Sequence, residues 1–240
     1  MSDSRDIHLR LADLARDMHG GSSADLDAVL AQTTEAALRL VPGADHVGIT
    51  LITGRREIQS MAPTDGDASL LDAIQRRHGE GPCLSSAWKQ HMIRCDDYSV
   101  EERWPIFTAT AMRETPVRSS LCFQLFTQNQ LLGALNVHSD EPDVFSDDSE
   151  EIGLILATHA AIALGTARRD KQFRSALATR DVIGQAKGIL MERYKISATE
   201  AFNLLVKLSQ ETNTQVSAVA EEFVASNVAQ PSSVAAVELD

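Results

Sequence analysis

Residues 121–139, LCFQLFTQNQLLGALNVHS, decide the fold class of this chain. They read as two β-strands joined at Gln128-Asn129-Gln130. Upstream, HVGITLITG at 46–54 alternates apolar residues on one face, which is the period of a strand. The segment RREIQSMAP at 55–63 is a matching partner strand, so we expect antiparallel pairing between neighbours in the sequence.

Helical patterns flank these strands. An amphipathic helix is predicted over about 24–40 and stops at Pro42-Gly43. DASLLDAIQRRHGEG at 67–81 is a second helix that ends at Gly79. Since strands and helices do not alternate in a repeated strand–helix–strand order, the fold class is α+β with an antiparallel sheet.

One unusually long helix follows the last strand. No proline occurs between Pro142 and Pro231, Ser146 can cap a helix, and the pattern continues to about Tyr194. Such a helix has roughly 48 residues and a length of about 72 Å at 1.5 Å per residue. Apolar residues at 3–4 spacing predict a self-associating but interrupted coiled coil: Ile152, Ile155, Ile162, Phe173, Ala176, Ile183 and Leu190.

The ends of the chain differ from its middle. DIHLRLADLARDMH at 6–19 predicts an N-terminal amphipathic helix within residues 1–22. Two shorter helices follow the long one; Ser197 and Glu200 form a capping box before the first, and Asn213 can cap the second. The segment 227–240 reads as a flexible tail.

Composition excludes several classes of protein. The 240 residues carry a formal net charge of −12, so the chain as a whole is no polycation for nucleic acid. The three cysteines lack C-x-x-C spacing, and no motif of a hydrolase or nucleotide-binding enzyme is present, so we expect no enzyme, metal or cofactor. The apolar run at 152–165 is too short to span a bilayer, and the N-terminus lacks a signal peptide, which predicts a cytoplasmic protein without a membrane contact.

The stretch RDVIGQAKGILMERYKIS at 180–197 contains two glycines one turn apart in a predicted helix. Each costs about 1 kcal/mol relative to alanine in a helix interior. One face carries Arg180, Gly184, Lys187 and Met191, and the neighbouring face is apolar and can pack. Two interpretations follow: the glycines open a notch for a phosphate backbone between two cations, or they let a following helix cross closely.

Residues 26–169 resemble a GAF domain. The resemblance rests on GEGPC at 79–83, on Asp96-Asp97 after the strand-like HMIRC, and on LLGALNVHSDEPDVFSDDSEEIGLILATHAAIAL at 131–164. It implies an antiparallel sheet with packed helices over about 23–170, dimerisation, and often a small molecule beside the sheet. The candidate pocket residues are Cys83, Trp88 and Phe123, although Cys83 also fits a buried small hydrophobe.

Residues 176–223 resemble an ANTAR domain, on ALATRDVIGQAKGILMERYKISATEAFNLLVKLSQETNTQVSAVAEEFV at 176–224. The resemblance implies a three-helix module, here 171–226, that binds paired RNA stem-loops and lets transcription continue past a terminator. The expected partners are therefore RNA hairpins, a second copy of the chain in a homodimer, and an unknown small molecule. The predicted RNA contacts are Arg180, Gly184, Lys187, Met191, Arg193, Lys207 and Asn213.

Two alternatives remain open at this stage. Two short capped helices after a long one also fit a DNA-binding helix-turn-helix, but TQVSAVAEEFV at 214–224 lacks Arg and Lys. The second alternative is a dimeric scaffold that binds neither a ligand nor RNA. Residues 176–226 hold five basic and six acidic residues, a net charge of −1, so RNA binding through duplex tracking is disfavoured against recognition of shape and loop bases.

Overall fold

The computed structural model describes residues 26–53, 57–89, 91–127 and 130–228. The chain divides into two compact units, Met1–Arg169 and Asp170–Asp240, and each is considered by itself. The predicted helix within residues 1–22 lies outside the described residues, and so does the predicted tail at 227–240 except for Asn227 and Val228, which belong to the last helix.

A five-stranded antiparallel sheet forms the centre of the first unit, in the order β2-β1-β5-β4-β3. Both predicted hairpins are confirmed: β1 pairs with β2, and β4 pairs with β5 through Thr127 and Gln130. The strands are β1 (His46–Thr53), β2 (Glu57–Met61), β3 (Met92–Cys95), β4 (Ser119–Thr127) and β5 (Gln130–Ser139).

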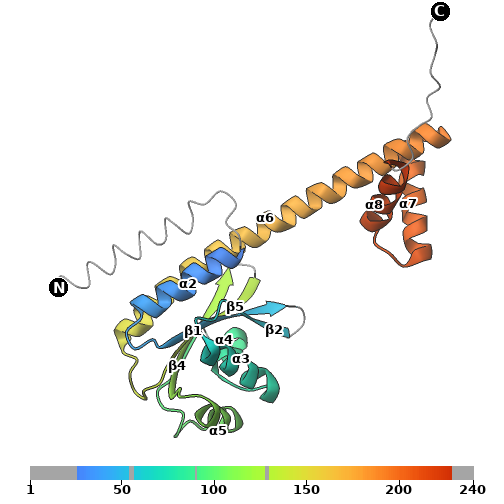
Figure 1. The fold of residues 1–240 in the computed structure, drawn as a ribbon. Helices are drawn as coiled ribbons and strands as arrows, with labels where there is room; N and C mark the ends of the chain where they lie inside the picture. Colours follow the sequence, from blue (N-terminus) through green and yellow to red (C-terminus); the bar gives the residue numbers. More distant parts are fainter. Residues whose placement is uncertain (1–25, 54–56, 90, 128–129, 229–240) are drawn as a thin grey trace, which may run out of the picture. The chain divides into compact units, whose positions relative to one another are not determined.

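Helices cover both faces of this sheet (Figure 1). On one face, α2 (Leu26–Leu40) and the first part of α6 (Asp147–Tyr194) share an apolar core with the strands. On the other face lie α3 (Gly66–His78) and α4 (Pro82–Lys89), and α5 (Pro105–Glu114) completes a second core with α3 and β3. The α+β class is therefore confirmed; α4 and α5 were not predicted from the sequence.

Close approaches fix two glycines in the first unit. A Cβ atom on Gly133 of β5 would lie 1.9 Å from the carbonyl oxygen of Thr50 on β1. One on Gly153 of α6 would lie 2.2 Å from the ring of Phe123. Non-bonded atoms never lie so close to a real Cβ. Glycine at these two positions therefore lets β5 approach β1 and lets α6 approach Phe123 of β4.

The long helix α6 is confirmed, with 48 residues. The Ser146 hydroxyl accepts a hydrogen bond from the Ser149 N–H at 3.4 Å, as expected of an N-cap. The predicted coiled-coil seam is wrong in part, because Ile152 and Leu190 are buried within their own units. Ile162 and Phe173 of that seam remain 44% and 70% exposed.

The second unit packs α7 (Ala198–Thr212) and α8 (Val216–Val228) against the end of α6. Ser197 and Glu200 form the predicted capping box. The prediction that Asn213 caps the last helix is wrong. Asn213 ends α7 instead, at φ 51° and with its N–H bonded to the Ser209 carbonyl, because asparagine tolerates this left-handed conformation.

Candidate functional site

A groove in the second unit runs along the face of α6 that carries the predicted cations. Its volume is about 420 Å³, within the range of small-ligand sites. Seven residues line the groove: Ala176, Thr179, Arg180, Ile183, Gly184, Lys187 and Phe202. The structure thus brings Arg180, Gly184 and Lys187 together, as the helical spacing predicts.

The adjoining face of the same helix forms the core of the second unit. Ala186 and Leu190 of α6 are 0% and 4% exposed, and they pack with Ala201 and Leu205 of α7 and Ala220 of α8. This packing fixes the rotation of α6, and the cationic face is left at the surface.

Neither glycine in the 180–197 stretch is explained by helix packing. A Cβ atom added to Gly184 or Gly188 would meet no heavy atom of the described chain within 4 Å outside the backbone of its own helix. The interpretation that these glycines let α7 or α8 cross closely is therefore wrong, because no atom of either helix lies within 4 Å of the Cβ position. Their helix-weakening cost has no structural compensation within the described part of the chain.

The other predicted RNA contacts do not line the groove. Met191 is 37% exposed, and Arg193 donates to the side chain of Asn227 at 3.0 Å. Lys207 lies on α7, with its Nζ 3.9 Å from a carboxylate oxygen of Glu211. Such an exposed pair holds Lys207 weakly, so its charge remains available to a partner.

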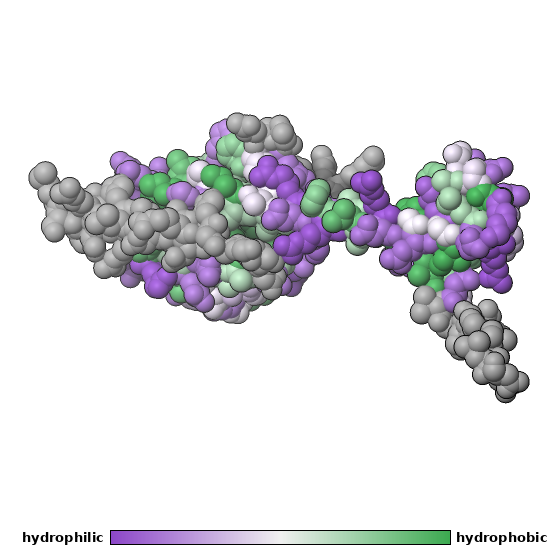
Figure 2. All heavy atoms as spheres, turned by 90° about the horizontal axis from the view of Figure 1, so that it is seen from above, coloured by the Kyte–Doolittle hydropathy of each residue, from purple (hydrophilic) through white to green (hydrophobic). Residues whose placement is uncertain are grey.

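Phe202 is a groove residue that the sequence reasoning did not single out. It is 41% exposed, and the Nζ of Lys187 lies 6.0 Å from the centre of its ring. Figure 2 shows apolar side chains at the surface of the C-terminal unit among hydrophilic ones. The signal that could have found Phe202 is its position directly after buried Ala201, because consecutive side chains of a helix do not point in the same direction.

The predicted pocket of the first unit is not assembled as expected. Cys83 and Cys122 are buried with their sulfur atoms 3.7 Å apart on the α4 side of the sheet. Phe123 is the next residue on β4 and contacts α6 on the opposite side, because neighbouring side chains of a strand point to opposite faces. Phe123 and Cys83 therefore do not line one cavity. Trp88 lies in α4, and its side chain is outside the described residues.

A buried polar row lies on the side of the sheet that faces α3. Asn136 donates to the Thr50 hydroxyl at 2.8 Å, and that hydroxyl donates to Asp72 of α3 at 3.1 Å. Burial raises the pKa of Asp72 to about 6, against hydrogen bonds and the charge of Arg76 that lower it. This face of the sheet is polar although it is closed from water.

His138 extends that row along β5. Its Nδ1 lies 2.6 Å from the Ser120 hydroxyl, and burial lowers its pKa to about 3, so the ring is neutral. The Nε2 of His138 and the Oδ1 of Asn136 are buried, and neither has a hydrogen-bond partner within the described ranges. Such atoms are rare in folded proteins and call for water or a ligand group.

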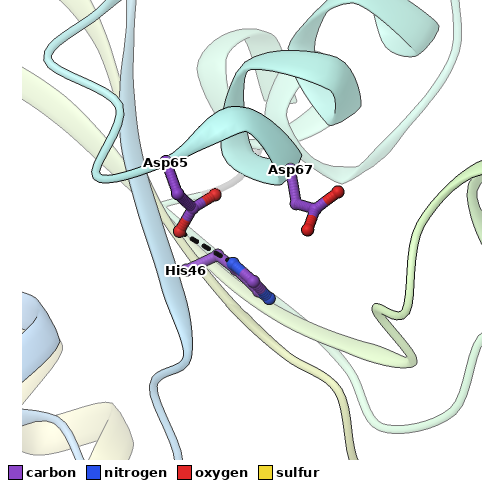
Figure 3. A group of neighbouring side chains, drawn as sticks. All are labelled: His46, Asp65 and Asp67. Carbon is purple, nitrogen blue, oxygen red and sulfur yellow. Dashed lines mark hydrogen bonds and ion pairs between the residues drawn. The ribbon is translucent and has the colours of Figure 1, made fainter.

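A second titratable cluster joins β1 to the start of α3 (Figure 3). The Nδ1 of His46 lies 2.8 Å from Asp65, the N-cap residue of α3, and its Nε2 lies 3.0 Å from Asp140. Partial burial lowers the pKa of His46, but the two carboxylates outweigh it and the net pKa is raised. A carboxylate oxygen of Asp67 lies within 4.8 Å of the ligand atoms of His46 and Asp65, a spacing at which three such groups could hold a metal ion. Since both ring nitrogens already face carboxylates, we interpret the cluster as an ion pair that holds α3 on the sheet.

Two family models match the chain. A GAF-domain model matches residues 23–165, and an ANTAR-domain model matches residues 171–224. A search of curated proteins found no match. Among the described residues, every helix is too short or too polar to cross a lipid bilayer.

Solved structures share the fold of the first unit. The GAF domain of a phosphoenolpyruvate-protein phosphotransferase from Coxiella burnetii is 19% identical, with a TM-score of 0.52 over 68% of this chain and 98% of that one. The chromophore-binding domain of a bacteriophytochrome from R. palustris is 10% identical, with a TM-score of 0.53 over 69% of this chain. This chain spans 63% of that domain. At these identities the likeness shows the fold alone.

Proposed function

The chain belongs to the GAF family and carries an ANTAR domain behind its GAF domain, and from this premise we propose that it binds paired RNA stem-loops and lets transcription pass a terminator in response to a signal. The GAF unit receives the signal, and the ANTAR unit is the RNA-binding module. The role is regulatory rather than catalytic.

The open cationic groove is the observation that supports RNA binding most directly. Arg180 and Lys187 lie on either side of Gly184, whose missing side chain leaves the backbone accessible. Two cations can hold phosphate oxygens while the sugar-phosphate chain enters the gap between them. A packed site would instead have filled this gap with a side chain.

Dimerisation supplies the affinity that one module lacks. Residues 176–226 have a net charge of −1, and non-specific affinity for nucleic acid scales with the number of phosphates neutralised. A homodimer presents two grooves to two adjacent stem-loops, so the second contact forms at a high effective concentration. Paired hairpins thus fit this weakly charged module better than a single hairpin does.

A small molecule with polar groups is the proposed signal for the GAF unit. The unsatisfied Nε2 of His138 and Oδ1 of Asn136 offer one ring nitrogen and one acceptor on the same face of β5. Water can form hydrogen bonds with these two atoms in the absence of a ligand, and a ligand that displaces the water can form them instead. The signal acts on transcription only if it binds two conformations of the chain with different affinity.

Removal of the two groove cations tests the RNA assignment. We expect the double variant Arg180→Gln/Lys187→Gln to bind a two-hairpin RNA about ten- to a hundredfold more weakly, with a salt slope lower by about two. A matched control is Arg77→Gln/Arg113→Gln, which removes two exposed charges from the GAF unit. Gel shifts at several salt concentrations measure both quantities.

Two results would contradict the assignment. One is equal RNA affinity of the groove variant and the control variant. The other is effective competition by duplex DNA, although α8 presents no Lys or Arg to a DNA groove.

A further inference from the structure

An aromatic side chain forms one wall of the cationic groove. Phe202 lies near the start of α7, and 41% of its surface remains exposed. Its neighbour Ala201 is fully buried, and Leu205 is fully buried one turn later, so the backbone that carries the ring is held by the core of the unit. The ring is thus presented on a rigid element and not on a loop.

The groups around this ring are suited to the base, the sugar and the phosphate of a nucleotide. Lys187 holds its ammonium 6.0 Å from the ring centre, and Arg180 lines the same groove. Gly184 leaves the floor between the two cations without a side chain. An aromatic face suits a flat base, and flanking cations beside an open backbone suit its sugar and phosphates.

We propose that the groove takes one unpaired nucleobase from the loop of an RNA hairpin, stacked on Phe202, with the adjoining phosphates on Arg180 and Lys187. This inference rests on the proposed RNA function and deepens it. Phe202 recognises a splayed base, while the two cations hold the backbone that carries it.

A stacked base accounts for binding by a module of low charge. The net charge of −1 over residues 176–226 limits what phosphate contacts can contribute. Stacking of a base on an aromatic side chain requires no further cations and tolerates different bases. Bases inside a duplex already stack on each other, so only an unpaired base, such as one in a hairpin loop, can enter the groove.

The test uses the full chain and a two-hairpin RNA retained by the wild-type protein from a pool with randomised loops. We expect Phe202→Leu to weaken binding about ten- to a hundredfold without changing the salt slope, because no phosphate contact is lost. Phe202→Trp should restore most of the affinity. The matched control is Leu204→Ala, which shortens a side chain on α7 that is 40% exposed and outside the groove, and it should bind within about threefold of wild type.

Single abasic nucleotides placed in turn through the loop identify the stacked base. An abasic site removes the base and keeps its phosphate. At the stacked position the penalty of Phe202→Leu should disappear, since two changes that remove one contact are not additive. At every other position the penalty should persist.

Each outcome bears on a different claim. If the wild-type chain retains no two-hairpin RNA, the RNA function and this inference both fail. If hairpins bind but Phe202→Leu matches wild type, or its penalty persists at every abasic position, the stacked base is wrong and the RNA function stands. Circular dichroism of each variant shows that the helices are intact.

Discussion

Asp72 and His46 show how local surroundings set the charge of single residues in the GAF unit. Asp72 is 2% exposed, and burial raises its pKa to about 6. His46 is only partly buried, and Asp65 and Asp140 raise its pKa despite that burial. Asp72 therefore disfavours the folded state as the pH rises, whereas His46 contributes most below its unfolded pKa and loses this contribution as the pH rises through its folded value.

Substitution of Asp72 should stabilise the protein at alkaline pH. The folded state holds the Asp72 proton more tightly than the unfolded state, so the wild type loses stability between about pH 4 and pH 6. Asp72→Asn has no proton to lose and keeps an oxygen for the Thr50 hydroxyl. We expect it to exceed the wild type by up to about 3 kcal/mol at pH 8 and by only about 1 kcal/mol at pH 4.5, at ~1.4 kcal/mol per unit of pKa.

Urea unfolding at these two pH values measures the effect. Asp148→Asn removes an exposed carboxylate from the first turn of α6 and should give no gain at pH 8, because helix N-termini favour negative charge. A gain for Asp72→Asn that is equal at both pH values would show that its carboxyl is not the cause.

The element α6 has different surroundings along its length. Its first turns pack on the sheet, where Gly153 lies against Phe123, and its last turns pack on α7 and α8. In that second region a Cβ atom added to Gly184 or Gly188 would meet no heavy atom of the described residues within 4 Å outside the backbone of its own helix. A glycine fixed by packing and a glycine left open therefore occur in one helix, and they should respond to substitution in opposite directions.

Alanine at the two open glycines separates folding from RNA binding. Gly184→Ala and Gly188→Ala should each raise stability by about 1 kcal/mol, because alanine favours the helix and its Cβ meets no neighbour. Only Gly184 lines the groove, so only Gly184→Ala should weaken RNA binding. Thermal unfolding and gel shifts of the pair provide the comparison. Equal RNA affinity of the two variants would mean that the gap at Gly184 receives no nucleic acid.

At the scale of the whole molecule, α6 exposes large apolar side chains that the described part of the chain does not cover. Phe173 and Leu177 are 70% and 48% exposed and lie one turn apart on α6. We propose that this stripe contacts a second copy of the chain, since a long helix with an apolar stripe favours helix pairing.

Polar residues in this stripe should dissociate the dimer. We expect Phe173→Gln/Leu177→Gln to sediment as a monomer where the wild type sediments as a dimer, because glutamine keeps the helix but removes the apolar contact. The wild type should bind a two-hairpin RNA with higher affinity than a single hairpin, and the variant should lose this difference. Ile106→Gln is the control, because Ile106 on α5 is 55% exposed and its replacement also removes an apolar side chain from the surface. A monomeric wild type would contradict this proposal.

Local pattern was sufficient to predict many features of the fold. The hairpins, the end of α3 at Gly79, the cap at Ser146 and the capping box at Ser197 each depend on a few neighbouring residues, and the structure confirms them. The face shared by Arg180, Gly184 and Lys187 also follows from helical spacing alone. Asn213 was assigned to the wrong helix because one asparagine can cap either end, and sequence does not show which.

By itself, the sequence determined the α+β class, the continuous helix to Tyr194 and the position of two cations beside a glycine, because periodicity and capping act over a few residues. Only the tertiary structure decided that Phe123 and Cys83 lie on opposite sides of the sheet, that no described helix packs on Gly184, and that Phe202 joins the groove. These facts depend on which residues meet across segments distant in the chain. Such contacts are set by how whole faces pack, and no local spacing encodes them.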